Sequence, residues 1–145
     1  MEVKKINKNI YFLRLEKEED IISSLKAFAE KEKLKGAFFY GIGAGKDFTI
    51  GCYDLKKKEY LKKRIKKDGE ILSLIGNISY VNNEIFVHTH ILISDKNFKI
   101  FGGHLFSAKV TATLEIFLLL IDKKLQRTFF PEIGLNLISF KKLRQ

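Results

Sequence analysis

Hydrophobic and polar positions along this 145-residue chain follow two different periods. Between Asp20 and Lys35 the apolar residues recur at helical spacing while lysine and glutamate fill the other positions, which predicts an amphipathic helix. The apolar positions of this helix are Ile21, Ile22, Leu25, Phe28, Ala29 and Leu34. Gly36 follows them and is expected to end the helix, because glycine readily adopts the left-handed conformation that closes many helices.

Short runs of β-branched and aromatic residues between polar turns predict strands in most of the remaining chain. The expected strands cover residues 9–15, 37–45, 48–54, 69–80, 85–93, 108–122 and 135–140. One helix and many strands joined by hairpins predict an α+β fold, in which a mainly antiparallel β-sheet carries one principal helix packed on it. The length and the absence of a linker predict a single domain over residues 1–145.

Three glycines interrupt the pattern at Gly41, Gly43 and Gly45. A phosphate-binding loop would need a helix to follow, whereas the next stretch, 48–54, has the pattern of a strand. The spacing therefore favours a bulge or tight bend within the sheet.

The chain carries a net charge of +10, and its densest basic run lies between residues 56 and 67. Few apolar residues interrupt this run, so we expect a turn followed by a solvated edge strand, where lysines discourage aggregation. The alternative is a stripe that contacts nucleic-acid phosphates. Its candidate contacts are Lys56, Lys57, Lys58, Lys62, Lys63 and Arg64. Because arginine, the preferred residue for such recognition, is scarce here, we interpret the charge first as a solubilising surface.

All three histidines of the chain lie within one predicted hairpin. His88 and His90 point to the same side of their strand, because side chains alternate faces. If residues 95–97 form a three-residue turn, Ser94 faces Phe98, His88 faces His104, and His90 faces Gly102, which leaves room beside the rings. A turn one residue shorter would send His104 to the other face.

Three imidazoles on one face predict a metal site, since catalytic zinc typically takes three protein ligands and keeps one position open. The alternative is two partly buried histidines that hydrogen-bond to their neighbours, with the third histidine at a turn. Two carboxylates are candidate catalytic groups. Glu70 opens a strand and could reach the metal or its water, or could be a solvated end residue. Glu115 lies among apolar neighbours, where it could pair with a cation or line the same pocket.

The chain offers no sign of export or of membrane insertion. Its longest purely apolar run, 116–121, is far too short to cross a bilayer, and the first residues do not have the pattern of a secretory signal. The single cysteine, Cys52, cannot form an intramolecular disulfide, and it reads most simply as a small strand residue. A cytoplasmic location without a membrane partner is therefore expected.

Five segments, taken in order, resemble the plants-and-prokaryotes-conserved (PPC) domain. They are 41–44 (GIGA), 69–78 (GEILSLIGNI), 87–90 (VHTH), 102–105 (GGHL) and 110–116 (VTATLEI). The resemblance spans nearly the whole chain and implies an α+β domain that assembles as a homotrimer. In plants the domain follows AT-hook DNA-binding motifs, and prokaryotic members are usually the bare domain. Its fold is also similar to that of acetolactate decarboxylase, which holds zinc through a His-x-His pair and a later histidine. That pattern falls on His88, His90 and His104.

Two departures from the plant proteins bear on function. The chain has no Arg-Gly-Arg, so the AT-hook is missing, and Asp68 and Gly69 stand where plant members carry arginine and phenylalanine. The first hypothesis is therefore a homotrimeric binding module, associated with DNA or regulation and carrying the histidine metal site. The alternatives are a zinc-dependent enzyme of lyase or hydrolase type, acting on a small carbonyl or carboxylate substrate, and a sensor that binds a small ligand or metal without turnover.

Overall fold

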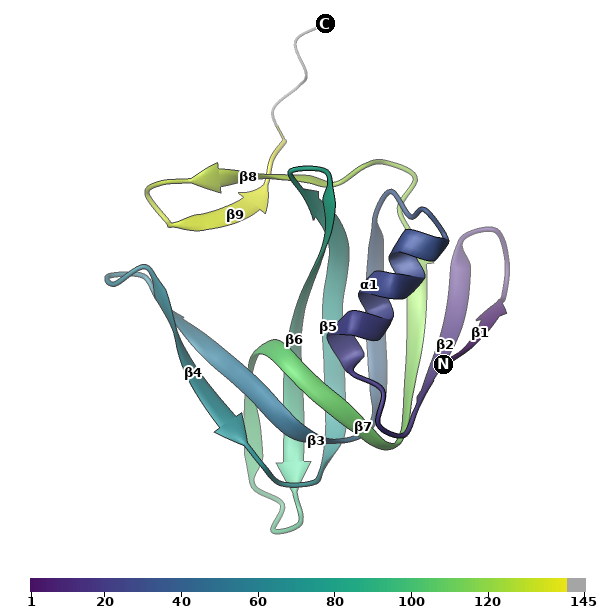
Figure 1. Ribbon diagram of the computed structural model, residues 1–145, viewed down its shortest axis with the longest axis vertical. Coiled ribbons are helices and arrows are strands. Elements are labelled where there is room, and N and C mark those ends of the chain that lie inside the picture. The colour runs from purple at the N-terminus through teal and green to yellow at the C-terminus, as the bar shows by residue number, and fades with distance from the viewer. Residues whose placement is uncertain (141–145) are drawn as a thin grey trace, which may run out of the picture.

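A computed structural model describes residues 1–140 of the chain, and the last five residues of the predicted domain lie outside them. One helix and nine strands follow one another in this part of the sequence (Figure 1). They are β1 (Glu2–Lys5), β2 (Ile10–Glu16), α1 (Ile21–Lys31), β3 (Ala37–Asp54), β4 (Glu59–Ile65), β5 (Gly69–Val81), β6 (Glu84–Asp95), β7 (Ile100–Leu120), β8 (Gln126–Phe130) and β9 (Leu135–Ile138).

All nine strands belong to one sheet, which is antiparallel except where β8 runs parallel to β5. Strand β3 pairs with β5 and β7, and β6 also pairs with both of those strands, so these four form a closed circuit of neighbours. Strand β4 pairs only with β3 and is an edge strand, as the basic run predicts. The mainly antiparallel sheet with one helix confirms the predicted α+β class.

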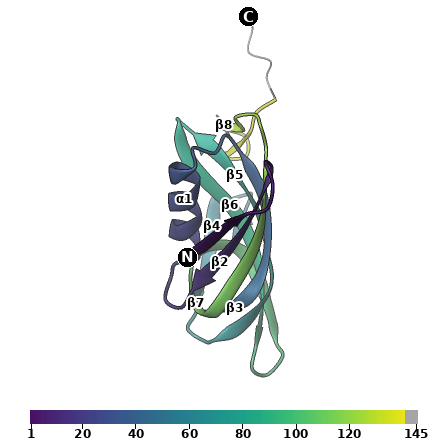
Figure 2. The same ribbon diagram turned by 90° about the vertical axis from the view of Figure 1, so that its right-hand side faces the viewer.

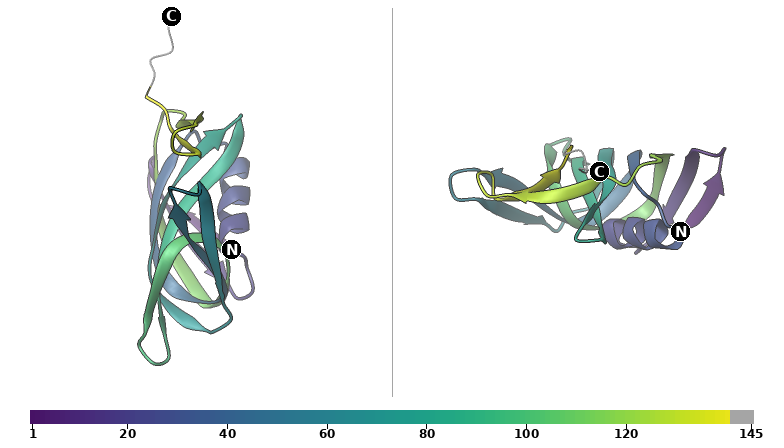
Figure 3. Two further views of the ribbon diagram at one scale, coloured as in Figure 1. Left: turned by 90° about the vertical axis from the view of Figure 1, so that its left-hand side faces the viewer. Right: turned by 90° about the horizontal axis from the view of Figure 1, so that it is seen from above.

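The helix covers one face of the sheet, and its apolar stripe makes the core (Figure 2). Leu25 and Phe28 of α1 are buried there together with Leu13, Phe39 and Leu114 from the sheet. Figure 3 shows that no helix lies against the opposite face, which we call the outer face. The alternation along each strand therefore divides a buried core side from an outer side, and the histidines are on the outer side.

Helix α1 ends earlier than Gly36. Its first turn is capped by Asp20, whose side chain accepts a hydrogen bond from the Ser23 amide at 2.9 Å. At the other end Lys33 takes a positive φ of 51°, and the Leu34 amide bonds back to the Ala29 carbonyl at 3.0 Å. Lys33 thus makes the left-handed closure expected of Gly36, and the chain turns in time for Leu34 to enter the core.

Two predicted strand breaks are absent, because bent strands continue through positions where the sequence suggests an end. Residues 37–45 and 48–54 form the single strand β3, and the strand predicted at 108–122 is continuous with the one that carries His104. The glycine-rich segment is a bulged region, as predicted, with register shifts between Gly41 and Gly43 and between Gly43 and Gly45. The last strand ends at Ile138 instead of 140.

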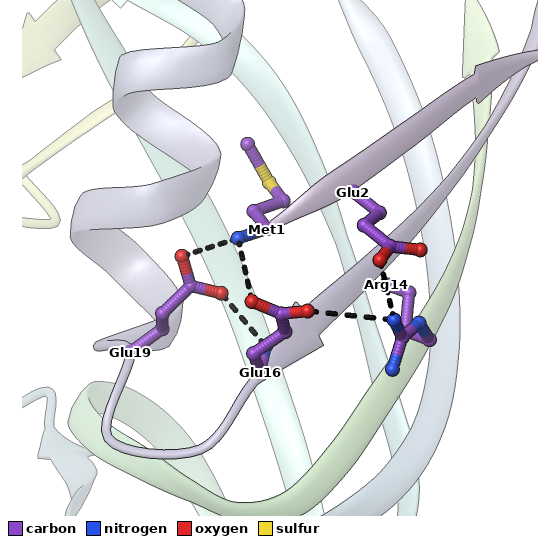
Figure 4. Close-up of polar contacts among 5 residues, drawn as sticks. All are labelled: Met1, Glu2, Arg14, Glu16 and Glu19. Atoms are coloured by element: carbon purple, nitrogen blue, oxygen red, sulfur yellow. Dashed lines mark hydrogen bonds and ion pairs between the residues drawn. The ribbon is translucent and has the colours of Figure 1, made fainter.

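A network of charges ties the N-terminal hairpin to the loop before α1 (Figure 4). The Met1 ammonium group donates to Glu19 at 2.6 Å and lies 3.7 Å from Glu16, and the hydrogen bond to Glu19 raises the pKa of the ammonium. Glu19 also accepts the amide of Glu16 at 2.7 Å. Arg14 bridges Glu2 at 2.7 Å and Glu16 at 3.4 Å. These contacts hold β1 and β2 beside the start of the helix.

Among the described residues, none of the helical segments is long and apolar enough to span a membrane.

Candidate metal centre

The three histidines converge on the outer face at the junction of β6 and β7. His88 and His90 are two residues apart on β6, and His90 lies directly opposite His104 on β7. The ring centroids are 5.2 Å apart for His88 and His90, 5.4 Å for His88 and His104, and 5.5 Å for His90 and His104. One ligand nitrogen from each ring lies within 4.8 Å of the other two, so the three residues could bind a metal ion.

The register of this hairpin differs by two residues from the predicted one. Ser94 pairs with Ile100 instead of Phe98, His90 pairs with His104 instead of Gly102, and Gly102 lies opposite Leu92. The turn therefore lies one residue further along the chain, although the shared face is as predicted, because a shift of two residues in the pairing returns every side chain to the same side.

Asp95 explains the position of the turn. Its carboxylate accepts hydrogen bonds from the amides of Asn97 at 2.9 Å and Lys99 at 3.1 Å, and the Asp95 and Lys99 backbones also bond to each other at 3.0 Å. Phe98 completes the turn with a positive φ of 60°. The loop residues are thus 96–98, instead of the 95–97 assumed from the sequence.

Aromatic side chains close one flank of the site. The rings of Tyr60 and Phe106 lie 4.9 Å and 4.8 Å from the ring of His104. They fit because Gly51, opposite His104, has no side chain: a Cβ there would lie 2.7 Å from the Phe106 ring. The glycine that leaves room for the cluster is therefore Gly51, and not Gly102.

Arg127 of β8 closes the other flank, and sequence reasoning did not single it out. Its guanidinium group donates to Ser79 Oγ at 2.8 Å, to Asn77 Oδ1 at 3.0 Å and to the Asn136 carbonyl at 2.9 Å. One Nη lies 3.2 Å from His88 Nδ1. Arg127 is only 6% exposed. The one available signal was that Arg127 is one of only four arginines in a lysine-rich chain.

The surroundings keep two of the rings neutral. Burial lowers the pKa of His88 to about 4, and the nearby charge of Arg127 adds to the effect. Burial also lowers the pKa of His104 to about 4, helped by His90, Arg127 and Lys62. Neutral imidazole is the form that binds metals, so His88 and His104 are ready to act as ligands near pH 7.

The donor set suits a transition metal. Within residues 1–140, His104 Nδ1 is buried and has no hydrogen-bond partner, which leaves a lone pair or N–H group unsatisfied. Three imidazole nitrogens suit zinc, copper, iron or nickel better than calcium or magnesium, which prefer oxygen. Zinc–nitrogen bonds are about 2.0–2.1 Å long, so small side-chain rotations would have to draw the three nitrogens closer together.

The two candidate carboxylates lie elsewhere on the outer face. Glu70 and Glu115 line a separate groove of about 400 Å³ together with Ile42, Leu72 and Thr113. Both carboxylates are exposed, and Glu115 lies opposite Arg14 instead of being buried. Glu70 is five residues along β5 from Ile75, the neighbour of His90, which is roughly 15 Å at the rise of a strand. The structure therefore does not bring these groups to the histidines.

A smaller hollow of about 250 Å³ adjoins the histidines. Its wall is formed by apolar and amide groups together with two of the histidine rings. The lining residues are Phe38, Ile75, Gly76, Asn77, His88, Thr89 and His90.

The predicted phosphate-contacting residues form an exposed strip on the β3–β4 hairpin. Lys56, Lys57 and Lys58 occupy the turn, and Lys62, Lys63 and Arg64 follow on β4. Several of these cations have partners within the chain. Arg64 lies 3.5 Å from Asp47, Lys58 donates to the Pro131 carbonyl at 2.6 Å, and the Lys62 ammonium lies 4.1 Å from the centre of the Phe106 ring.

The fold and the site together define a small α+β domain with a candidate three-histidine metal centre on an open sheet face. The chain belongs to the Plants and Prokaryotes Conserved (PCC) domain family, the PPC domain named above, whose family model matches residues 4–122. No curated protein matches the chain.

Several solved structures share this fold. A proposed DNA-binding protein from Bacteroides thetaiotaomicron is 30% identical, with a TM-score of 0.92 over 97% of this chain and 98% of that chain. A PPC protein from Pyrococcus horikoshii is 34% identical, with a TM-score of 0.85 over 98% and 96%. A metal-containing protein from Archaeoglobus fulgidus is 38% identical, with a TM-score of 0.83 over 95% of each chain.

Acetolactate decarboxylase from Bacillus subtilis is a more distant structural relative. It is 13% identical, with a TM-score of 0.54 over 80% of this chain and 54% of that chain. At this identity the likeness concerns the fold alone.

Proposed function

We propose that this chain is a self-associating PPC-domain binding module that holds a zinc ion through His88, His90 and His104. The observation that carries the proposal is the convergence of the three rings, with ligand nitrogens within 4.8 Å of one another on neighbouring strands. Bound zinc would supply a positive centre with an open coordination position for an oxygen or nitrogen donor. A relative that is 38% identical is described as metal-containing, which adds support.

The proposed assembly is a homotrimer formed through the outer face. Seven large apolar side chains on this face are 43–58% exposed. They are Phe38, Tyr40, Ile42, Ile75, Leu92, Phe117 and Leu119. Large exposed apolar patches of this kind mark interaction sites. Covering such a surface with copies of the same chain would remove it from water. The trimeric state itself rests on the resemblance to the family.

Metal analysis of purified protein, after zinc loading and dialysis, tests the metal part of the proposal. We expect about one zinc per chain in the wild type, and loss of zinc in His90→Ala and in His104→Ala. Cys52→Ser is the matched control, since Cys52 is the only thiol in the chain and should not matter. Zinc retained by the histidine variants, or lost from the cysteine variant, would contradict the assignment.

Contact with DNA is the second candidate function. It is supported by the exposed cations of the β3–β4 hairpin and by two relatives described as proposed DNA-binding proteins, 30% and 27% identical. Titration with duplex DNA at two salt concentrations tests it, because phosphate contacts predict an affinity that falls steeply as salt rises. Replacing Lys56, Lys57 and Lys63 by glutamine should weaken that binding. Affinity that is independent of salt and of these lysines would remove this candidate.

A zinc-dependent enzyme is less well supported than a binding module. A three-histidine zinc site could polarise a small carbonyl or carboxylate ligand, but general acid–base chemistry needs a proton carrier within hydrogen-bond reach of the reacting atoms. Glu70 and Glu115 line a different groove. Nearly all donors of Arg127 are already used by protein groups, so it does not offer a ready carboxylate clamp.

A further inference from the structure

The contact between Arg127 and His88 uses the only free lone pair of the histidine ring. A guanidinium group can donate hydrogen bonds but cannot accept them, so His88 Nδ1 must be the acceptor at their 3.2 Å separation. A neutral imidazole has one acceptor nitrogen and one N–H group. With Nδ1 accepting from Arg127, the proton of the ring is on Nε2.

A metal ion cannot share the ring with this hydrogen bond. If the metal binds Nδ1, it needs the lone pair that Arg127 occupies. If it binds Nε2, the ring proton must move to Nδ1, where an N–H group would face the N–H group of Arg127. Only a doubly deprotonated ring could serve both partners, and imidazole gives up its second proton far above physiological pH. Either choice of ligand nitrogen therefore breaks the contact.

We propose that Arg127 is a built-in competitor for the metal at His88, so that metal binding and the Arg127–His88 hydrogen bond exclude each other. This inference rests on the proposed metal function and adds its regulation. In most metal-ligating histidines the second ring nitrogen donates a hydrogen bond to an acceptor such as a carboxylate or carbonyl, which strengthens the ligand. Here the partner is a positively charged donor, which weakens the site and makes its occupancy reversible.

Arg127 stays close to the site when His88 is released. Its bonds to Ser79, Asn77 and the Asn136 carbonyl do not involve the histidine and hold the guanidinium in place. Its charge therefore continues to oppose a nearby cation. Arg127 lies outside residues 4–122, the part of the chain that matches the family model, so this control belongs to the C-terminal hairpin.

The competition also links the metal to the β8–β9 hairpin. That hairpin pairs with β5 at only two residue positions, Tyr80 with Gln126 and Val81 with Arg127. At its tip the Tyr53 hydroxyl donates to the Ile133 carbonyl at 2.7 Å. Losing the bond to His88 removes one of the few ties between the hairpin and the sheet, so metal binding should loosen β8.

Zinc affinity, measured by competition with a chromophoric chelator, tests the proposal on the full-length protein. Arg127→Gln removes the charge and offers an oxygen that can accept from Nδ1–H, so we expect it to tighten zinc binding about tenfold or more, the scale of a charged hydrogen bond. Tyr53→Phe is the matched control, because it loosens the hairpin tip without touching His88, and its affinity should stay within about twofold of the wild type. Unchanged or weaker binding in a folded Arg127→Gln protein would overturn the proposal, as would equal tightening in Tyr53→Phe.

A second measurement needs no variant and covers the case in which Arg127→Gln does not fold. Long-range ¹H–¹⁵N NMR spectra of the histidine rings report which nitrogen carries the proton. In metal-free wild type we expect His88 protonated on Nε2, and after zinc addition either a proton on Nδ1 or a metal on Nδ1. A metal-free ring already protonated on Nδ1 would refute the competition.

The two proposals can fail separately. If neither the wild type nor Arg127→Gln binds zinc, the metal function fails and the competition fails with it. If the wild type binds zinc through His90 and His104 but Arg127→Gln binds no tighter, only the competition fails. Zinc binding by Arg127→Gln alone would support the competition strongly.

Discussion

At the scale of single residues, the site owes its character to uncharged histidines beside a buried cation. His88 and His104 both have a pKa lowered to about 4, first by burial and then by neighbouring positive groups that include Arg127. Protonation of either ring would place a further charge beside the guanidinium. The same arrangement that prepares the rings for a metal therefore makes the metal-free protein sensitive to acid.

We predict that metal-free protein loses stability as the pH falls from 6.5 toward 4. The unfolded histidines have a pKa near 6.5 and the folded ones about 4, so in this window the unfolded chain binds more protons. The free energy of unfolding should therefore fall by up to about 2 kcal/mol per ring between pH 7.5 and pH 5.0. Urea unfolding in the presence of a chelator measures it.

A double variant is the control for this pH dependence. His88→Gln combined with His104→Gln removes both titrating rings, while each glutamine can still accept a hydrogen bond. We expect the difference between pH 7.5 and pH 5.0 to shrink clearly in the double variant. An identical difference in the two proteins would show that other groups cause the effect.

At the scale of elements, the β6–β7 hairpin brings His104 to the other two rings. The turn is fixed by Asp95, which binds two amides through its side chain and pairs with Lys99. The amides of Asn97 and Lys99 hold the pKa of this carboxyl below its usual range, although burial opposes them. The turn and the metal site should therefore be coupled.

We predict that Asp95→Ala lowers both the thermal stability and the zinc affinity. The substitution leaves two turn amides without their acceptor and frees the register that places His104 opposite His90. Lys96→Ala, at an exposed position of the same turn, is the matched control and should change neither quantity appreciably. Thermal unfolding and chelator competition measure the two effects. If Asp95→Ala behaves like Lys96→Ala, the side chain does not set the turn.

The same hairpin illustrates what the sequence can predict. Strand alternation places His88, His90 and His104 on one face for every register that differs by an even number of residues, so the cluster was predictable although the partner residues were not. The position of the turn depended on side-chain hydrogen bonds of Asp95, which the hydrophobic pattern does not encode. Arg127 could not be predicted. It is 39 residues from His88 in the sequence, and only the parallel pairing of β8 with β5 brings the two side chains together.

At the scale of the whole molecule, the two faces of the sheet have opposite roles. The core face is covered by α1 and carries the buried apolar side chains, whereas the outer face carries the histidines and a broad apolar surface. Phe38 and Phe39 are adjacent in β3 and point to opposite faces, with exposed fractions of 43% and 0%. They allow the two roles to be separated with one kind of substitution.

We predict that Phe39→Ala destabilises the folded chain by about 3–5 kcal/mol, because it opens a cavity in the core. Phe38→Ala removes the same ring from the outer face and should cost the isolated chain far less. Urea unfolding at a low protein concentration, where association contributes least, compares the two. Similar losses for both variants would mean that the outer face is buried within the chain itself.

Self-association through the outer face leads to a prediction about charge. Phe117 lies near the centre of that face and is 58% exposed, so Phe117→Glu should leave the fold intact and still break the assembly, because an unpaired carboxylate is costly to bury. Phe98→Glu introduces the same charge at the tip of the β6–β7 turn, where the ring is 87% exposed, and should leave the assembly unchanged. Sedimentation equilibrium gives the mass of each species, and circular dichroism checks the fold. We expect trimers for the wild type and Phe98→Glu, and monomers for Phe117→Glu. A trimer that survives Phe117→Glu would place the interface elsewhere, and a wild-type monomer would remove self-association from the proposed function while leaving the histidine site untouched.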